Sequence, residues 1–130
     1  MPLVEMTTPG QGGGGGSKTA YGEFTFSSGT VTVNYADDGF EPFTASKLVL
    51  QQYNNGSFGT TRSNYIYNAD FNQNKTTTFF YSSGVNYIQQ DDYPHSETNL
   101  TGLVEITSTG FKFRANSAAY GGTFKYFAME

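Results

Sequence analysis

The chain has 130 residues, no cysteine and a formal net charge of −4, and aromatic residues (17%) outnumber charged ones (14%). This length suits one domain with a buried core, and the lack of cysteine excludes disulfides, thiolate metal sites and a cysteine nucleophile. The 7 Lys and Arg residues are scattered, so no basic stripe is present and duplex nucleic acid is not an expected partner.

Neither a membrane span nor a secretion signal is expected. No apolar run approaches the ~18 residues that a membrane-spanning helix needs. The first residues have neither the basic start nor the long apolar stretch of a signal peptide. The core must instead be built from the 12 Phe and 10 Tyr residues, which favour strands over helices.

The first residues predict an attachment arm. The apolar segment "MPLVEM" is followed by five glycines at 12–16, and such a run behaves as a flexible tether. An apolar segment before a tether can add a strand to another protein or lie in its groove. We therefore assign residues 1–20 to an N-terminal arm and 21–130 to the domain. The predicted partner-binding residues of the arm are Met1, Pro2, Leu3, Val4 and Met6.

The string "GGGGGSKT" nearly spells a phosphate-binding loop. Ser17 stands where the second required glycine should be, and the residues after Lys18 are strand-like. The helix N-terminus that would hold a phosphate is therefore missing. We expect no nucleotide site and no cofactor.

The first half of the domain alternates with a period of two, which indicates half-buried strands. Strands are expected at 21–26, 30–35 and 46–53, and Leu48 and Leu50 should point inward. An Asn-Gly pair at Asn55 and Gly56 predicts a type I′ hairpin turn, from which 58–67 returns.

The second half continues the pattern. Strands are expected at 76–81, 85–89, 103–107, 111–115 and 123–129, with a polar loop at 71–75 and the longest loop at 91–99. The side chains expected to share faces are Val104 with Ile106, Phe111 with Phe113, and Phe124 with Tyr126 and Ala128. The aromatic last strand should lie in the centre of the core.

These elements predict an all-β fold. About eight or nine short strands at spacings of roughly 8–12 residues indicate an antiparallel β-sandwich, jelly-roll-like, rather than a helical or α/β fold. The extended Gly-rich arm precedes it.

Three strings carry a resemblance to a known group of domains. They are "VTVNYADDGFEPFTASKLVLQQY" at 31–53, "ITSTGFKF" at 106–113 and "GGTFKYFAME" at 121–130. Together they resemble small β-sandwich domains of bacteriophage virion proteins, found on tail fibres, head fibres and capsid decorations. The strand order is also similar to the trimeric H-type lectin fold. The resemblance implies a virion surface location and a homotrimer.

Catalytic and metal chemistry is not expected. His95 is the only histidine and shares a loop with Asp91, Asp92 and Glu97, but this spacing matches no established metal loop and acidic loop residues are usually solvated. No nucleophile-elbow motif is present. The acids lie in turns or at outward strand positions, so we predict no enzyme, although a carboxylate pair in a cleft would indicate a glycan depolymerase.

Surface tyrosines offer a candidate glycan surface, because aromatic rings stack on sugar C–H faces. The candidates are Tyr53, Tyr65, Tyr67 and Tyr87. Ordinary outward strand residues explain the same pattern, and that interpretation is the stronger one.

The expected function is that of a phage virion structural protein: a capsid decoration, head-fibre or tail-fibre subunit. Residues 1–16 would bind other capsid or tail proteins. The alternative is a receptor-binding, lectin-like module of a phage tail that recognises a host surface glycan.

Overall fold

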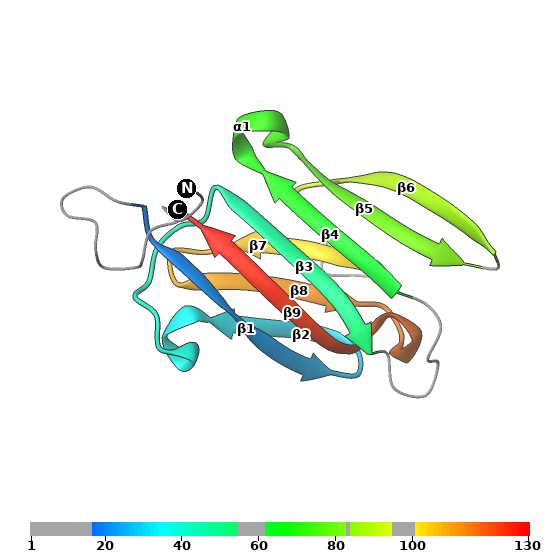
Figure 1. The fold of residues 1–130 in the computed structure, drawn as a ribbon, viewed down its shortest axis with the longest axis horizontal. Helices are drawn as coiled ribbons and strands as arrows, with labels where there is room; N and C mark the ends of the chain where they lie inside the picture. Colours follow the sequence, from blue (N-terminus) through cyan, green and yellow to red (C-terminus); the bar gives the residue numbers. More distant parts are fainter. Residues whose placement is uncertain (1–16, 55–61, 83, 95–100) are drawn as a thin grey trace, which may run out of the picture.

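The structure is a computed structural model that describes residues 17–54, 62–82, 84–94 and 101–130. Two antiparallel sheets form a sandwich (Figure 1). The larger has six strands in the order β1-β9-β3-β4-β5-β6, and the smaller has three in the order β2-β8-β7. This confirms the predicted all-β antiparallel sandwich.

Short helices interrupt the strands only at turns. The strands are β1 (Thr19–Phe26), β2 (Gly29–Asn34), β3 (Lys47–Asn54), β4 (Arg62–Asn68), β5 (Lys75–Ser82), β6 (Val85–Asp92), β7 (Gly102–Ile106), β8 (Gly110–Ala115) and β9 (Gly122–Met129). The helices are η2 (Tyr35–Asp38), α1 (Ala69–Asn72) and η4 (Ala118–Tyr120). The loop predicted at 71–75 is partly wrong, because the Asn68 side chain accepts hydrogen bonds from the amides of Asp70 and Phe71 and starts the single turn of α1.

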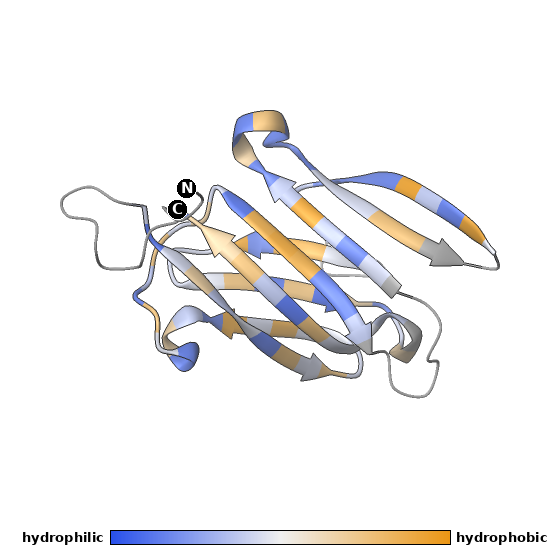
Figure 2. Ribbon diagram, viewed as in Figure 1, coloured by the Kyte–Doolittle hydropathy of each residue, from blue (hydrophilic) through white to orange (hydrophobic). Residues whose placement is uncertain are grey.

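The C-terminal strand lies inside the large sheet, as predicted. β9 pairs with β1 on one side and with β3 on the other. Its inward side chains, Phe124, Tyr126 and Ala128, are buried. Figure 2 shows the corresponding alternation of apolar and polar residues along these strands. Both neighbours of β9 therefore depend on it for their hydrogen bonds.

An aromatic interlock joins the two sheets. The Phe124 ring stacks on Phe24 with ring centres 5.2 Å apart and planes 4° apart. From the small sheet, Phe113 meets Phe124 at 5.2 Å and Phe111 meets the Tyr126 ring edge-on at 5.3 Å. Offset and edge-on ring pairs stabilise beyond the area that they bury.

The alternation predicted for β7 is wrong at Val104. The β7–β8 register shifts between Leu103 and Glu105, which is the signature of a β-bulge. One extra residue in a strand moves the following side chains to the other face. Leu103 therefore lies opposite Phe113 and Ile106 opposite Phe111, instead of Val104 sharing the face of Ile106.

The Asn-Gly turn predicted at Asn55 and Gly56 falls on residues 55–61, outside the described residues. In the described part of the two strands Gln51 pairs with Asn64, whereas a two-residue loop at Asn55 and Gly56 would pair it with Thr60. The partner of Gln51 is displaced by an even number of residues, from Thr60 to Asn64, so the inward side chains of both strands still meet in the core.

The two sheets differ in width. The rings of Phe24, Phe26 and Tyr65, on β1 and β4, contact the small sheet. β5 and β6 continue the large sheet beyond this overlap (Figure 1), and β6 is exposed over nearly its whole length. The sandwich therefore ends in a hairpin that stands away from the core.

We expect Phe124→Ala to destabilise the protein by about 3–5 kcal/mol, because it empties the centre of the interlock. Urea denaturation measures this change. Phe71→Ala is the matched control: Phe71 is 80% exposed on α1, and its loss should alter the free energy of unfolding by less than about 0.5 kcal/mol. Equal effects of the two variants would contradict the central role of β9.

Candidate interaction surfaces

The junction between the arm and the domain is held by Lys18. Its amide donates to Glu130 Oε1 at 3.1 Å, and its carbonyl accepts from the Glu130 amide at 2.9 Å. Its Nζ lies 3.4 Å from Glu41 Oε1 and donates to the Pro42 carbonyl at 3.4 Å. A force on residues 1–16 would therefore reach the body of the domain directly.

Residues 1–16 lie outside the described part of the chain. The predicted arm contacts, Met1, Pro2, Leu3, Val4 and Met6, therefore stay predictions.

The outer face of the large sheet carries an exposed apolar row. Tyr21 and Val49 flank Phe127 in the register of β1, β9 and β3, and all three side chains are exposed. The Tyr21 ring also packs on Phe40 with ring centres 4.8 Å apart. We call Tyr21, Phe127 and Val49 the outer row.

Next to the outer row lies a polar cluster around Tyr53. The Tyr53 hydroxyl donates to Glu23 Oε2 at 2.5 Å, and Lys125 Nζ lies 5.1 Å from the ring centre. The hydrogen bond to the Glu23 carboxylate raises the pKa of Tyr53 above its ordinary value. The Lys125 ammonium lies over one face of the Tyr53 ring in a cation–π contact.

The β5–β6 hairpin is apolar on both faces. Phe80 stacks on Tyr87 on one face, with ring centres 5.0 Å apart. Phe79 lies opposite Ile88 on the other face. Ile88 is 71% exposed and Tyr87 is 44% exposed. Figure 2 shows apolar residues on both strands.

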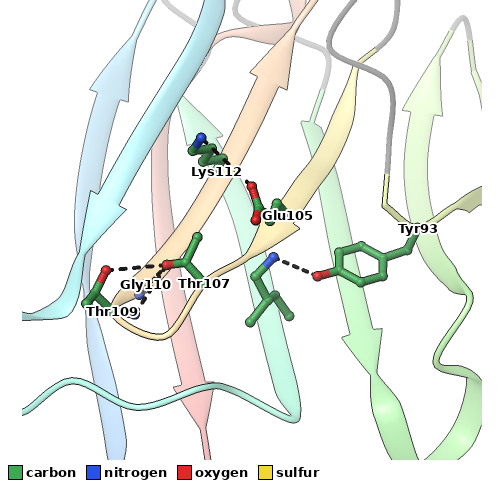
Figure 3. Close-up of polar contacts among 7 residues, drawn as sticks. Tyr93, Glu105, Thr107, Thr109, Gly110 and Lys112 are labelled. Carbon is green, nitrogen blue, oxygen red and sulfur yellow. Dashed lines mark hydrogen bonds and ion pairs between the residues drawn. The ribbon is translucent and has the colours of Figure 1, made fainter.

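Tyr93 ties the base of this hairpin to the small sheet. Its hydroxyl accepts a hydrogen bond from the Ile106 amide at 2.7 Å (Figure 3). Its own amide donates to the Asn74 carbonyl at 3.0 Å. Burial raises the pKa of the Tyr93 hydroxyl. The hairpin is thus fixed at its Asp92 end, next to this bridge.

The neighbouring β7–β8 turn is built by Thr107. Its Oγ1 accepts from the Gly110 amide at 3.0 Å and from the Thr109 amide at 3.2 Å (Figure 3). Gly110 is required because a Cβ there would lie 1.8 Å from the Val33 carbonyl oxygen. Lys112 and Glu105 form an exposed ion pair at 3.8 Å, which adds little stability.

Two of the four predicted glycan-surface tyrosines are misplaced. Tyr65 and Tyr67 are only 4% and 8% exposed. Tyr65 packs edge-on against Phe113 at 4.8 Å, and Tyr67 meets Tyr93 at 4.6 Å. The reason is that Ile66 alternates with them, so the sequence allowed either set to face the core. Their rings are not available to a sugar.

The other two tyrosines lie on opposite faces. Leu50 and Gln52 are buried, so Tyr53 points to the outer face. Tyr87 pairs with Phe80, which lies opposite the buried Ser63 on the inner face. The four tyrosines therefore do not form one surface, and glycan binding by Tyr53 or Tyr87 stays a prediction.

A partly buried hydroxyl–carboxylate contact lies at the other end of the core. Tyr126 donates to Asp38 Oδ2 at 2.5 Å. Burial first, and then this hydrogen bond, raise the pKa of Tyr126 far above its ordinary value. Its hydroxyl therefore remains protonated and holds η2 against β9.

Neither metal nor membrane chemistry is indicated where the chain is described. No group of three His, Asp or Glu side chains lies close enough there to hold a metal ion. His95 and Glu97 of the loop considered above lie outside the described residues, while Asp92 pairs with Lys75 at 2.6 Å. Within the described ranges, no helix has the length and apolar character needed to cross a membrane.

These observations define the class of the chain as an antiparallel β-sandwich with an overhanging hairpin. No protein-family model, curated protein or solved structure matches it.

Sequence reasoning missed the two-sided character of the hairpin. The signal was present, because Phe79 and Phe80 are adjacent and must point to opposite faces of a strand. The contacts of Lys18 and Tyr93 had no local signal, since their partners lie far away along the chain.

We expect the protein to lose stability as the pH rises from 10 to 12. Burial raises the pKa of Tyr65 from 10.0 to about 12, so the unfolded chain releases this proton first. The contribution is fully present below pH 10, and a shift of two units corresponds to about 3 kcal/mol. Urea denaturation across this range measures it, and Tyr65→Phe should reduce the loss. An unchanged slope in that variant would contradict the assignment.

Proposed function

We propose that this protein is a non-enzymatic structural subunit of a phage virion, either a capsid decoration or a head-fibre or tail-fibre subunit. Residues 1–16 attach it to capsid or tail proteins, and the sandwich is displayed on the particle surface. The resemblance of the strings at 31–53, 106–113 and 121–130 to virion β-sandwich domains supports this proposal.

The observation that carries the proposal is the junction at Lys18. An attachment arm needs a fixed point of origin, because a loosely joined arm would slide or unravel the first strand under load. Lys18 binds the terminal residue Glu130 through backbone and side chain, and it contacts Glu41 and Pro42. These contacts join the arm to β1 and β9 together.

A homotrimer suits the same role. Three arms on one assembly multiply weak contacts by avidity. Association would also cover the apolar side chains that the single chain exposes on the outer row and on β6.

A lectin-like module is the second candidate. Tyr87 is 44% exposed and stacks on Phe80 at the edge of the large sheet. Gln89 and Asp91 follow it on the same strand face and hydrogen-bond at 3.0 Å. A ring beside amide and carboxylate groups is chemistry suited to a sugar.

Deletion of residues 1–16 tests the first proposal. We expect the shortened chain to fold, because Lys18 and its contacts remain, but to lose association with virus particles. Co-sedimentation with particles measures association, and circular dichroism confirms folding. Lys125→Ala in the full chain is the control, since it alters an exposed cation outside residues 1–16. Particle association that survives the deletion would end the proposal.

Tyr87→Ala tests the second candidate. If the hairpin binds glycans, this variant should lower retention on a glycan array about fivefold, because stacking on one ring contributes on the order of 1 kcal/mol. Tyr21→Ala is the matched control, since it removes an exposed tyrosine from the outer row. A flat response of the folded wild-type protein to every sugar would rule the candidate out.

A further inference from the structure

We propose that the segment 2–6 of one copy adds as a strand to the free edge of β6 in a second copy of this chain. The inference rests on the proposed function of residues 1–16 as an attachment arm, and it names one partner for that arm.

Among the strands that the structure describes, none pairs with the outer edge of β6. β6 ends the large sheet and is eight residues long, and its only charged residues are Asp91 and Asp92 at its last two positions. Natural edge strands are usually interrupted by a charge, a proline or a bulge, because free backbone groups recruit other strands. At the opposite edge, β1 carries the exposed Glu23 in mid-strand, and in the small sheet β7 carries a bulge. β6 has neither device.

The side chains around this edge favour an incoming strand that is apolar on both faces. Ile88 and Phe79 lie on one face of the hairpin, and Tyr87 and Phe80 lie on the other. A strand added beside β6 would continue both faces at once, with a spacing of about 4.8 Å. Polar residues on either face of that strand would leave one apolar pair uncovered.

The arm has this pattern. In an extended segment 2–6, Leu3 and Glu5 point to one face, and Val4 and Met6 point to the other with Pro2. Each face therefore presents at least one apolar side chain. The outer row would contact only one face of such a segment, so the β6 edge buries more of it. The backbone hydrogen bonds come from strand addition itself.

The length of the tether favours a second copy over the same chain. β1 and β6 are five strand positions apart, which is about 24 Å at the usual strand spacing. For a Gly-rich stretch of ten residues, the length of 7–16, the expected root-mean-square end-to-end distance is about 16–19 Å. Reaching the β6 of its own chain would therefore stretch the tether, whereas the edge of another copy carries no such cost.

Arm and acceptor are different surfaces, so the contact is heterologous. Such contacts form rings when the rotation closes, and a closed ring of three would agree with the trimer implied by the resemblance to virion domains.

Sedimentation velocity of the full-length chain over a range of concentrations tests the inference. We expect the wild-type mass to rise with concentration to that of a small oligomer. The double variant Leu3→Asp/Val4→Asp places a charge on each face of the arm, and Ile88→Lys places one on the acceptor. Each should weaken association at least about tenfold, since each removes a buried aliphatic side chain.

Phe71→Lys is the matched control for Ile88→Lys, because Phe71 is an exposed apolar residue outside β6, and it should leave association unchanged. Thermal melts of all variants confirm folding. A synthetic peptide of residues 1–8 added to the wild-type chain provides a second measurement. It should dissociate the oligomer, and the same peptide with aspartate at positions 3 and 4 should not.

Three results would overturn the inference. One is a wild-type chain that stays at the mass of a single copy at every concentration. Another is an oligomer sensitive to Ile88→Lys but not to the Leu3→Asp/Val4→Asp change, which would indicate direct pairing of β6 with β6. The third is an oligomer that ignores both variants. If the first result occurs while deletion of 1–16 still abolishes particle binding, the proposed function stands and only this inference fails.

Discussion

The packing of β9 between β1 and β3 is the constraint on which the rest of the sandwich depends. The backbone of β9 hydrogen-bonds to a strand on each side and so holds the large sheet together. Its inward side chains contact the rings of Phe111 and Phe113 and so hold the small sheet. Glu130, directly after β9, then holds the start of β1, because it hydrogen-bonds Lys18. The stability of the core and the position of the arm junction therefore come from the same strand.

The unequal width of the sheets follows from where this interlock ends. The small sheet covers the aromatic side chains as far as Tyr65 on β4, and beyond it the buried side chains of β5 are threonines, Thr76 and Thr78. These residues are too small to support a second layer of rings. β6 consequently lies outside the overlap, with apolar side chains on both faces. Its exposure is thus a result of how the aromatic residues are distributed along the chain.

The sequence predicted where the strands lie better than it predicted which of their side chains face the core. Alternation located the inward residues of β8 and β9, because Phe113 and Phe124 have polar neighbours that must point outward. In β3, Leu48 is buried as predicted although its neighbour Val49 is apolar and exposed. Alternation failed for β4, where Tyr and Ile alternate and both sets suit a core, and at the bulge in β7. The pairing of Gln51 with Asn64 between β3 and β4 is not the register that the Asn-Gly pair indicated. The site contacts of Lys18 and Tyr93 join distant segments, so no local pattern could reveal them.

The start of β1 and the edge of β6 lie at opposite edges of the large sheet, and this arrangement relates the proposed attachment to the proposed self-association. Residues 17 and 18 lead into β1 at one edge of the large sheet, and β6 lies at the other edge of the same sheet (Figure 1). If residues 1–16 act as the proposed arm and β6 as its acceptor, each subunit has a direction, and every added copy would present a new edge unless the ring closes. Closure would remove the exposed edge that invites non-specific strand pairing.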